Sequence, residues 1–339
     1  MKLVIQIPCF NEEKTLPQTI ADIPRQINGV DQVEILVIDD GSSDATSRIA
    51  KELGVEHIIL HRGNRGLAAA FQSGIDEALR LGADIIVNTD GDNQYKGGDI
   101  PKLIQPLLDA EADVVVGDRE VMKIAHFGLG KKLLSRLGSK VVQRVAGVEI
   151  PDAVSGFRAF TRQAAMELNI VSSFSYTIEM LLQCGRKRLS VTSVPVGVNG
   201  KLRSSRLFRN IPEFILYSVS TLLRIYAMMR PLRFFLMLGG LFSLIGLSAM
   251  LRFLFYYVTG DGDGHVQSLV IGGAILMIGA VTFLIGLLAD LISFNRQLIE
   301  GLLLRIKGMD LELQTLHKKV DKLAVKKAES SVVSSSDVQ

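Results

Sequence analysis

Cysteine is scarce in this chain, and the two that occur, Cys9 and Cys184, lie far apart among its 339 residues. A disulfide-stapled fold and a cysteine-based metal site are therefore excluded. The net charge of +3 is too small to indicate a protein that binds nucleic acid. The opening residues, MKLVIQIP, lack the length and cleavage pattern of an export signal, so we expect the N-terminal part to stay in the cytoplasm.

Two long runs in the second half almost lack charged residues. Residues 234–258 carry only Arg252, and residues 266–289 carry no charge. Both exceed the roughly 20 residues that cross the hydrocarbon core of a bilayer, which favours two transmembrane helices over buried core helices. Their connection, residues 259–265, has no lysine or arginine, whereas both outer flanks are basic, so the positive-inside rule predicts a multi-pass inner-membrane protein with both chain ends in the cytoplasm. The basic flanks contain Arg230, Arg233, Arg296, Arg305 and Lys307.

Three further segments flank this predicted hairpin, which we place at residues 232–290. Residues 205–231 interleave apolar with basic side chains, which predicts amphipathic helices at the membrane interface, with a solvated basic face as the alternative. Residues 291–327 carry an apolar heptad pattern, which favours a coiled coil and a homo-oligomer over one amphipathic helix packed on its own domain. The Ser-rich residues 328–339 are predicted to be disordered. The heptad positions are Ile299, Leu302, Ile306, Met309, Leu313, Leu316, Val320 and Leu323.

Residues 1–204 alternate short β-rich runs with helical patterns, which indicates an α/β domain with a mainly parallel sheet and helices on both faces. In such sheets ligands bind at the carboxyl ends of the strands. Polar clusters at residues 8–13, 39–44 and 90–92 follow three of the predicted strands, so we expect them to meet at one rim. The predicted strands are 3–8, 34–39, 56–60, 84–89, 113–117 and 190–196, and the predicted helices are 16–27, 45–53, 66–81 and 100–109.

The sharpest polar cluster is Asp90-Gly91-Asp92, which follows the apolar run 85–87. Two carboxylates placed two residues apart at a strand end repel each other unless a cation lies between them. Mg²⁺ and Mn²⁺ take oxygen ligands and share them with substrate phosphates, so the segment fits a metal–diphosphate clamp that Gln94 can join. An ordinary turn is the alternative for this segment taken alone.

The other clusters supply groups that a nucleotide-sugar donor needs. Asp39, Asp40 and Glu12 follow strands and can accept hydrogen bonds from a ribose or a base. The turn at residues 63–66 leads into a helix, so it offers backbone N–H groups and the cationic Arg65 to a phosphate.

Five segments of the first 200 residues resemble, in the same order, those of the family 2 inverting nucleotide-sugar glycosyltransferases, which have the GT-A fold. The last segment, taken with the two C-terminal spans, is most similar to the polyprenyl-phosphate branch, which includes dolichyl-phosphate mannose synthase and bacterial undecaprenyl-phosphate glucosyltransferases. The segments are IPCFNE (7–12), VIDDGSSD (37–44), GNRG (63–66), TDGD (89–92) and DAVSGFR (152–158).

The resemblance implies roles at the matching positions on the donor side. Asp90, Asp92 and Gln94 would hold Mg²⁺ or Mn²⁺ together with the donor, and Asp92 would be catalytic. The implied donor-binding residues are Pro8, Glu12, Asp39, Asp40, Asp90 and Arg65.

On the acceptor side the resemblance implies that Arg119 binds a phosphate and acts in catalysis. Asp118 stands where the family commonly has a serine, and Lys131 stands in place of an arginine. The implied acceptor-phosphate residues are Arg119, Lys131, Ser135, Arg158 and Lys201.

The implied reaction moves a sugar from a UDP- or GDP-linked donor to a polyprenyl phosphate at the cytoplasmic face of the lipid bilayer, with inversion at the anomeric carbon. A phosphate monoester is already anionic near neutral pH, so no general base is needed. Two alternatives stay open. A membrane glycosyltransferase with a saccharide acceptor would need a base, for which Asp152 is a candidate. A non-catalytic scaffold would bind nucleotides at the membrane without turnover.

Overall fold

The computed structural model describes residues 1–120, 129–170, 176–200, 220, 223–224, 226–227, 230–260 and 263–336. The chain divides into two compact units. We call residues 1–208 with 302–339 the sheet unit and residues 209–301 the hairpin unit.

A mixed sheet forms the centre of the sheet unit, and among the described residues it has seven strands in the order β3-β2-β1-β4-β6-β5-β7. β6 runs antiparallel to both of its neighbours, β4 and β5, while the other adjacent pairs are parallel. The six predicted strands are confirmed within one or two residues at each end, and β6 is a strand that the sequence did not predict. The bounds are β1 Lys2–Cys9, β2 Gln32–Asp39, β3 His57–Leu60, β4 Ile85–Asn88, β5 Val114–Asp118, β6 Arg158–Thr161 and β7 Val191–Pro195.

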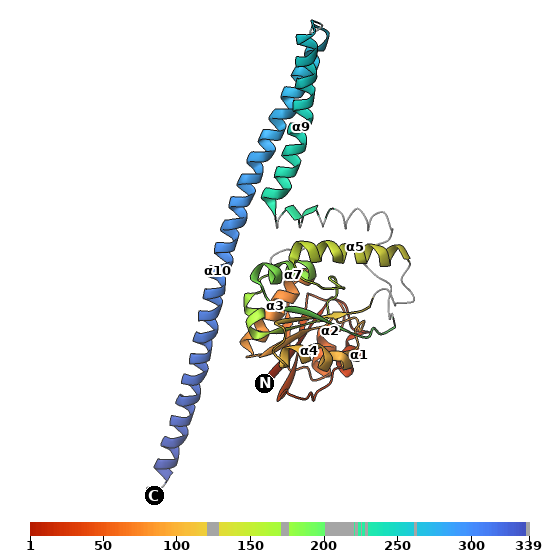
Figure 1. Cartoon of the computed structure of the whole chain (residues 1–339). Helices are drawn as coiled ribbons and strands as arrows, with labels where there is room; N and C mark the ends of the chain where they lie inside the picture. The colour runs from red at the N-terminus through yellow and green to blue at the C-terminus, as the bar shows by residue number, and fades with distance from the viewer. Residues whose placement is uncertain are drawn as a thin grey trace. The chain divides into compact units, whose positions relative to one another are not determined.

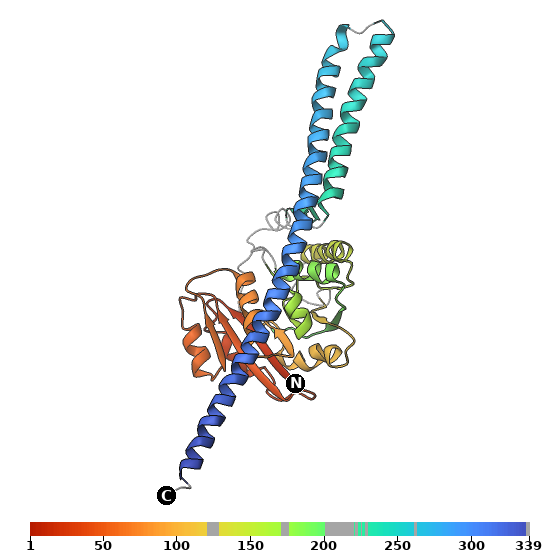
Figure 2. The ribbon, with the colours of Figure 1, turned by 90° about the vertical axis from the view of Figure 1, so that its left-hand side faces the viewer.

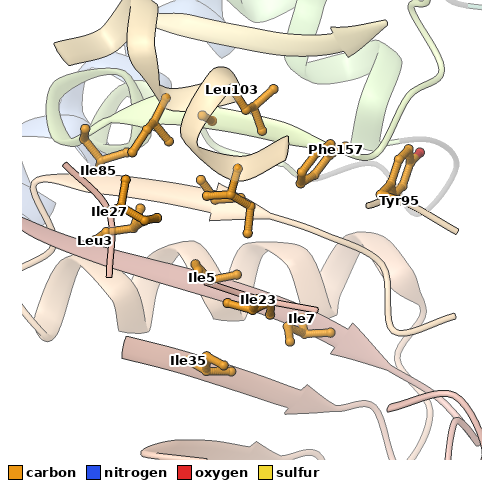
Figure 3. Close-up of a cluster of buried hydrophobic side chains, with 14 of the residues drawn as sticks. Leu3, Ile5, Ile7, Ile23, Ile27, Ile35, Ile85, Tyr95, Leu103 and Phe157 are labelled. Carbon is orange, nitrogen blue, oxygen red and sulfur yellow. The ribbon is translucent and has the colours of Figure 1, made fainter. Parts of the chain in front are cut away.

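The central strands are apolar because helices cover both faces of the sheet. Leu3, Ile5 and Ile7 of β1 are fully buried in the core on one face (Figure 3). On the other face Gln6 lies against helix α3, Leu67–Arg80, where Gly74 has no side chain and so permits a close approach. A Cβ on Gly74 would lie 2.4 Å from the Gln6 side-chain oxygen.

The helices α1, α2 and α4 pack on the first face, and α3 and α7 pack on the second (Figure 1). The predicted helix at 16–27 ends early, at Ala21, because Pro24 restricts the residue before it and lacks a backbone N–H. The bounds are α1 Leu16–Ala21, α2 Thr46–Glu52, α3 Leu67–Arg80, η1 Gly97–Asp99, α4 Ile100–Leu108, α5 Leu129–Ala146, α6 Arg162–Glu167 and α7 Tyr176–Lys187.

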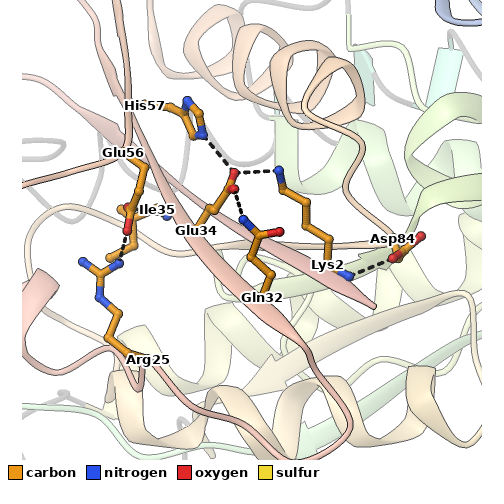
Figure 4. A network of polar contacts seen from close by, with 8 residues as sticks. All are labelled: Lys2, Arg25, Gln32, Glu34, Ile35, Glu56, His57 and Asp84. Atoms are coloured by element: carbon orange, nitrogen blue, oxygen red, sulfur yellow. Dashed lines mark hydrogen bonds and ion pairs between the residues drawn. The ribbon is translucent and has the colours of Figure 1, made fainter. Parts of the chain in front are cut away.

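A polar network closes the end of the sheet at which β1, β2 and β3 begin (Figure 4). The Glu34 carboxylate lies 2.8 Å from both Lys2 Nζ and His57 Nε2, and it accepts a 2.6 Å hydrogen bond from Gln32 Nε2. Burial raises the pKa of Glu34, but the hydrogen bonds from Lys2 and His57 outweigh burial and hold this pKa below its ordinary value. The network therefore stabilises the end of the sheet opposite to the polar rim.

The hairpin unit contains α9, Pro231–Val258, a short turn η3, Asp263–His265, and the first part of α10, Val266–Ser336. α9 and α10 run side by side in it (Figure 2). Gly246 and Gly272 let the two backbones touch, since a Cβ on either glycine would lie within 2.8 Å of the other's carbonyl oxygen. By length and composition, α9 and residues Val266–Asp310 of α10 can each cross a membrane.

α10 continues as a helix to Ser336, into the segment 328–339 that the sequence analysis predicts to be disordered. Most of the predicted interfacial helices at 205–231 lie outside the described residues.

Candidate active site

Parallel pairing brings the carboxyl ends of β1, β2 and β4 to one rim of the sheet. Cys9 pairs with Asp39, and Gln6 pairs with Asn88, so the loops that follow these strands emerge together. The Asp40 N–H donates to the Cys9 carbonyl over 2.9 Å, which joins the first two loops directly. The predicted convergence of three polar clusters on one rim is therefore confirmed.

Asp40 anchors the loop that follows β3. One carboxylate oxygen accepts the Arg65 N–H over 2.9 Å and lies 2.7 Å from His61 Nδ1, and the other accepts the Gly66 N–H over 2.8 Å. Gly41 has a φ of +74° and lies against the backbone of Gly63, with no room for a Cβ. The buried Asp40 therefore shapes the glycine-rich turn, while the Arg65 side chain is exposed.

The other donor-side residues lie along the same rim. Pro8 is buried within β1, and the Asp39 carboxylate accepts the Ser42 N–H over 2.8 Å. Glu12 is buried and accepts a 2.7 Å hydrogen bond from the Thr15 hydroxyl. These contacts hold Asp39 and Glu12 within the rim.

Asp90 and Asp92 sit in the loop after β4 and are both partly exposed. Burial, and then the neighbouring Asp92 charge, raise the pKa of Asp90 to about 7, although Arg119 lowers it. The Gln94 N–H donates to Asp92 Oδ1 over 3.1 Å. A cation would relieve the repulsion between the two carboxylates, which is the second cause of this raised pKa after burial.

No group of three or more His, Cys, Asp or Glu side chains in the described part of the chain could by itself enclose a metal ion. Two carboxylates still fit Mg²⁺ or Mn²⁺, because these ions commonly take one or two carboxylates and complete their shell with water and substrate phosphates. The two carboxylates of Asp90 and Asp92 therefore fit a metal that is shared with a diphosphate, and the backbone of Gln94 adjoins them.

The loop at residues 152–157 folds onto Asp90. Asn88 Nδ2 donates to the Gly156 carbonyl over 2.8 Å, and the Gly156 N–H donates to the Tyr95 hydroxyl over 2.8 Å. A Cβ on Gly156 would lie 2.9 and 3.0 Å from the two Asp90 carboxylate oxygens. The glycine of this motif is therefore required for the loop to approach the carboxylate.

Arg119, just after β5, is clamped by Asp152. Its Nε donates to Asp152 Oδ2 over 2.6 Å, and its Nη2 donates to Oδ1 over 2.9 Å. The side chains are 12% and 1% exposed, respectively. Burial opposes the charge of Arg119, but Tyr95, Asp152 and Asp90 outweigh it and raise the pKa of this guanidinium. A fixed cation thus lies within the electrostatic field of the donor-side carboxylate.

Arg158, which the resemblance assigns to the acceptor phosphate, directs its guanidinium at backbone carbonyls of the protein itself. It is fully buried, and its guanidinium donates over 2.7–2.8 Å to the carbonyls of Ala153, Ser155 and Thr177. Because those donors are committed to backbone acceptors, Arg158 holds the loop that covers Asp90.

Three acceptor-side residues cannot be placed in the site. Lys131 and Ser135 lie on α5, but their side chains are outside the described part of the structure, and Lys201 is outside it altogether. The structure adds Asn88, Tyr95 and Asn199, which the sequence analysis did not select. Asn199 Nδ2 donates to the Asn93 carbonyl over 3.2 Å and so braces the loop that carries Asp92. The one signal in the sequence that could have pointed to these residues is Asn88, a polar residue at the end of an apolar, buried strand.

Comparisons with known proteins agree with this geometry. A sequence profile for the family described as Glycosyl transferase family 2 matches residues 4–168. The UDP-N-acetylglucosamine–dolichyl-phosphate N-acetylglucosaminyltransferase of Methanococcus voltae is 30% identical over 211 residues, which cover 56% of this chain and 82% of that protein. The chain belongs to glycosyltransferase family 2. The dodecaprenyl-phosphate galacturonate synthase of Rhizobium johnstonii is 27% identical to this glycosyltransferase over 294 residues, which cover 82% of the chain and 83% of the relative.

The glycosyltransferase also shares its fold with a solved structure. Glucosyl-3-phosphoglycerate synthase from Mycobacterium tuberculosis superposes with a TM-score of 0.53 and 22% identity, over 67% of this chain and 79% of that one. That protein was crystallised with Mn²⁺, uridine diphosphate and glucosyl-3-phosphoglycerate, and also with Mn²⁺, UDP-glucose and phosphoglyceric acid. The likeness supports the predicted GT-A-like architecture of the sheet.

Proposed function

We propose that this glycosyltransferase moves a sugar from a nucleoside-diphosphate sugar to a polyprenyl phosphate, with inversion at the anomeric carbon. The observation that carries the proposal is the buried Arg119–Asp152 clamp beside Asp90. A guanidinium has five N–H donors, so Asp152 can hold Arg119 through Nε and one N–H of Nη2 while Nη1 and the second N–H of Nη2 bond a phosphate. The names of both relatives include a prenyl-type lipid phosphate, which supports the same class of acceptor.

The donor side holds the departing nucleoside diphosphate. We assign Asp90, Asp92 and Gln94 to a divalent ion, which when bound supplies Lewis-acid stabilisation to the diphosphate. Glu12 and Asp39 line the same rim and can hydrogen-bond the nucleoside. Asp40 acts through the loop that it anchors, since its carboxylate already has three partners in the protein.

The acceptor side needs no proton transfer. A phosphate monoester carries about 1.5 to 2 negative charges at neutral pH, so its oxygen is already a nucleophile. That oxygen forms a bond to the anomeric carbon while the bond from this carbon to the diphosphate oxygen breaks. Arg119 orients the attacking phosphate, so catalysis comes from positioning and charge stabilisation.

We place this reaction at the cytoplasmic face of the membrane. α9 and the first part of α10 are long and apolar enough to span a bilayer. The loop between them lacks lysine and arginine, and both outer flanks are basic, which favours the sheet unit on the cytoplasmic side. A prenyl phosphate exposes its headgroup at such a surface, so anchoring keeps enzyme and acceptor together.

A saccharide acceptor has less support. Such an acceptor needs a general base, and the candidate Asp152 is 1% exposed and engaged by two hydrogen bonds from Arg119. Nothing in the described part of the site favours this reaction over transfer to phosphate.

The proposal is tested with purified protein, a short prenyl phosphate and a panel of labelled UDP- and GDP-sugars. We expect a chloroform-soluble labelled product with at least one donor. Arg119→Gln is expected to abolish transfer or raise the acceptor KM while donor binding persists. The matched control is Arg80→Gln, because Arg80 is 53% exposed and ends α3 at the opposite end of that helix from the glycine-rich turn. Absence of a lipid-soluble product with every donor, or equal loss of donor binding in Arg119→Gln, would refute the proposal.

A further inference from the structure

α10 carries a row of large apolar side chains that are exposed in the structure and lie beyond its charge-free run at 266–289. Five residues, which we call the seam, are between 56% and 63% exposed although all are apolar. They recur at alternating spacings of three and four, the period of a coiled-coil stripe. A continuous exposed apolar stripe on a helix marks an interaction site. The seam consists of Leu302, Ile306, Met309, Leu313 and Leu316.

The face of α10 opposite the seam contacts other helices of the sheet unit. Lys307 Nζ lies 2.6 Å from the Asp76 carboxylate on α3. A Cβ on Gly308 would lie 4.0 Å from Met166 on α6, and Leu304 is partly buried. In the heptad these three α10 residues take the b, c and f positions, opposite the a and d positions of the seam. The helix is therefore docked on one side and open on the other.

The residues of the stripe specify which partner fits it. The a positions at 299, 306, 313 and 320 read Ile, Ile, Leu and Val, and the d positions at 302, 309, 316 and 323 read Leu, Met, Leu and Leu. β-Branched residues at a with leucine at d favour two strands over three or four, and three of the four a positions and three of the four d positions follow this rule. The flanking g and e positions carry Arg305 and Asp310, which face each other between chains in a parallel pair.

We propose that a second copy of this chain docks on the seam to form a parallel, in-register coiled-coil dimer. The direction rests on the membrane anchoring proposed above. α10 is one continuous helix from the apolar span through the seam, so two copies inserted in the same way extend their seams in the same direction. Each protomer then keeps its own sheet unit on the outer side of the pair.

The dimer is tested by cysteine cross-linking of the full chain in membranes. The native Cys9 and Cys184 are both buried, and burial raises the pKa of both thiols, that of Cys184 to about 12, so neither competes. Met309→Cys is expected to give roughly tenfold more oxidised dimer than Gly301→Cys, because d positions meet across the seam and c positions lie outside it. Gly301 is a matched control, since it is exposed and a Cβ there meets open space.

The register is tested with differently tagged Leu302→Cys and Leu316→Cys chains expressed together. A parallel dimer yields only like-with-like cross-links, whereas 302-to-316 cross-links indicate an antiparallel pair and overturn the proposal. Equal cross-linking of Met309→Cys and Gly301→Cys indicates random collision and also overturns it. Sugar transfer to prenyl phosphate is measured on the same membranes. Transfer without specific cross-linking refutes the dimer alone, and cross-linking without transfer refutes the proposed reaction alone.

Discussion

Replacing Asp152 with asparagine removes one charge from a pair that water barely reaches. The two hydrogen bonds to Arg119 measure 2.6 and 2.9 Å, and the side chains are 1% and 12% exposed. Asparagine keeps the shape of aspartate but turns an N–H₂ group toward one of the guanidinium donors. Asp152→Asn therefore leaves a buried guanidinium without its counter-charge.

The expected cost follows from this burial. Removing one partner of a buried ion pair costs about 3–5 kcal/mol of unfolding free energy, and the residual exposure of Arg119 places the cost near 3 kcal/mol. With a denaturant slope of about 2 kcal/mol per molar urea, the midpoint of unfolding falls by about 1.5 M. The matched control is Lys102→Ala, which breaks a 2.8 Å ion pair to Asp99 in which Lys102 is 69% exposed. That change should cost about 1 kcal/mol at most.

Pulse proteolysis in urea, applied to the purified full chain in detergent, reports the unfolding of the sheet unit. The same Asp152→Asn preparation is assayed for transfer, and we expect a raised acceptor KM with an almost unchanged donor KM, since Arg119 loses its orientation. If Asp152→Asn moves the midpoint no further than Lys102→Ala does, or raises both KM values equally, the assignment of the clamp to the acceptor side is wrong.

Three further predictions concern other parts of the sheet unit. Gly156→Ala should lower kcat/KM about a hundredfold, because its Cβ would push the Asp90 carboxylate. Gly138→Ala, in open space on α5, should leave kcat/KM unchanged, and equal activities would contradict the packing argument. The lowered pKa of Glu34 contributes stability that is present above its unfolded pKa and is lost as pH falls through the folded pKa. Thermal melts between pH 7 and pH 3 should thus fall more steeply for the native chain than for Glu34→Gln, and parallel curves would refute the role of the Lys2 ion pair. Chelation of divalent ions should reduce transfer by a factor of about a hundred or more, with recovery on adding Mg²⁺ or Mn²⁺, and undiminished transfer in chelator would exclude a metal.

The rim of the site was predictable from sequence because strand direction and strand ends are local signals. Apolar runs before the polar clusters located β1, β2 and β4, and parallel pairing then required Asp39 and Asp90 to emerge on the same side. The heptad pattern likewise predicted a helix after the second apolar run, and α10 contains it.

The acceptor side was less predictable because it depends on contacts between distant residues. Arg119 and Asp152 are 33 residues apart, and no local sequence pattern predicts that they pair. The position of Arg158 in its motif suggests that it binds a phosphate. Only the fold shows that its guanidinium donates hydrogen bonds to backbone carbonyls. β6 has four residues with no clear period, and its antiparallel place between β4 and β5 is set by its neighbours.

Because β6 runs antiparallel to β4 and β5, it begins at the rim where those two strands end. The segment at 152–157 leads into β6 at the end of the sheet where β4 and β5 finish. The residues that we assign to the nucleotide side come from positions 8–94, whereas the clamp and its covering loop come from positions 119–158. The sequence of each segment can therefore change independently during evolution. A different lipid or headgroup can be accepted through changes in residues 119–158 while the residues that bind the sugar nucleotide stay the same.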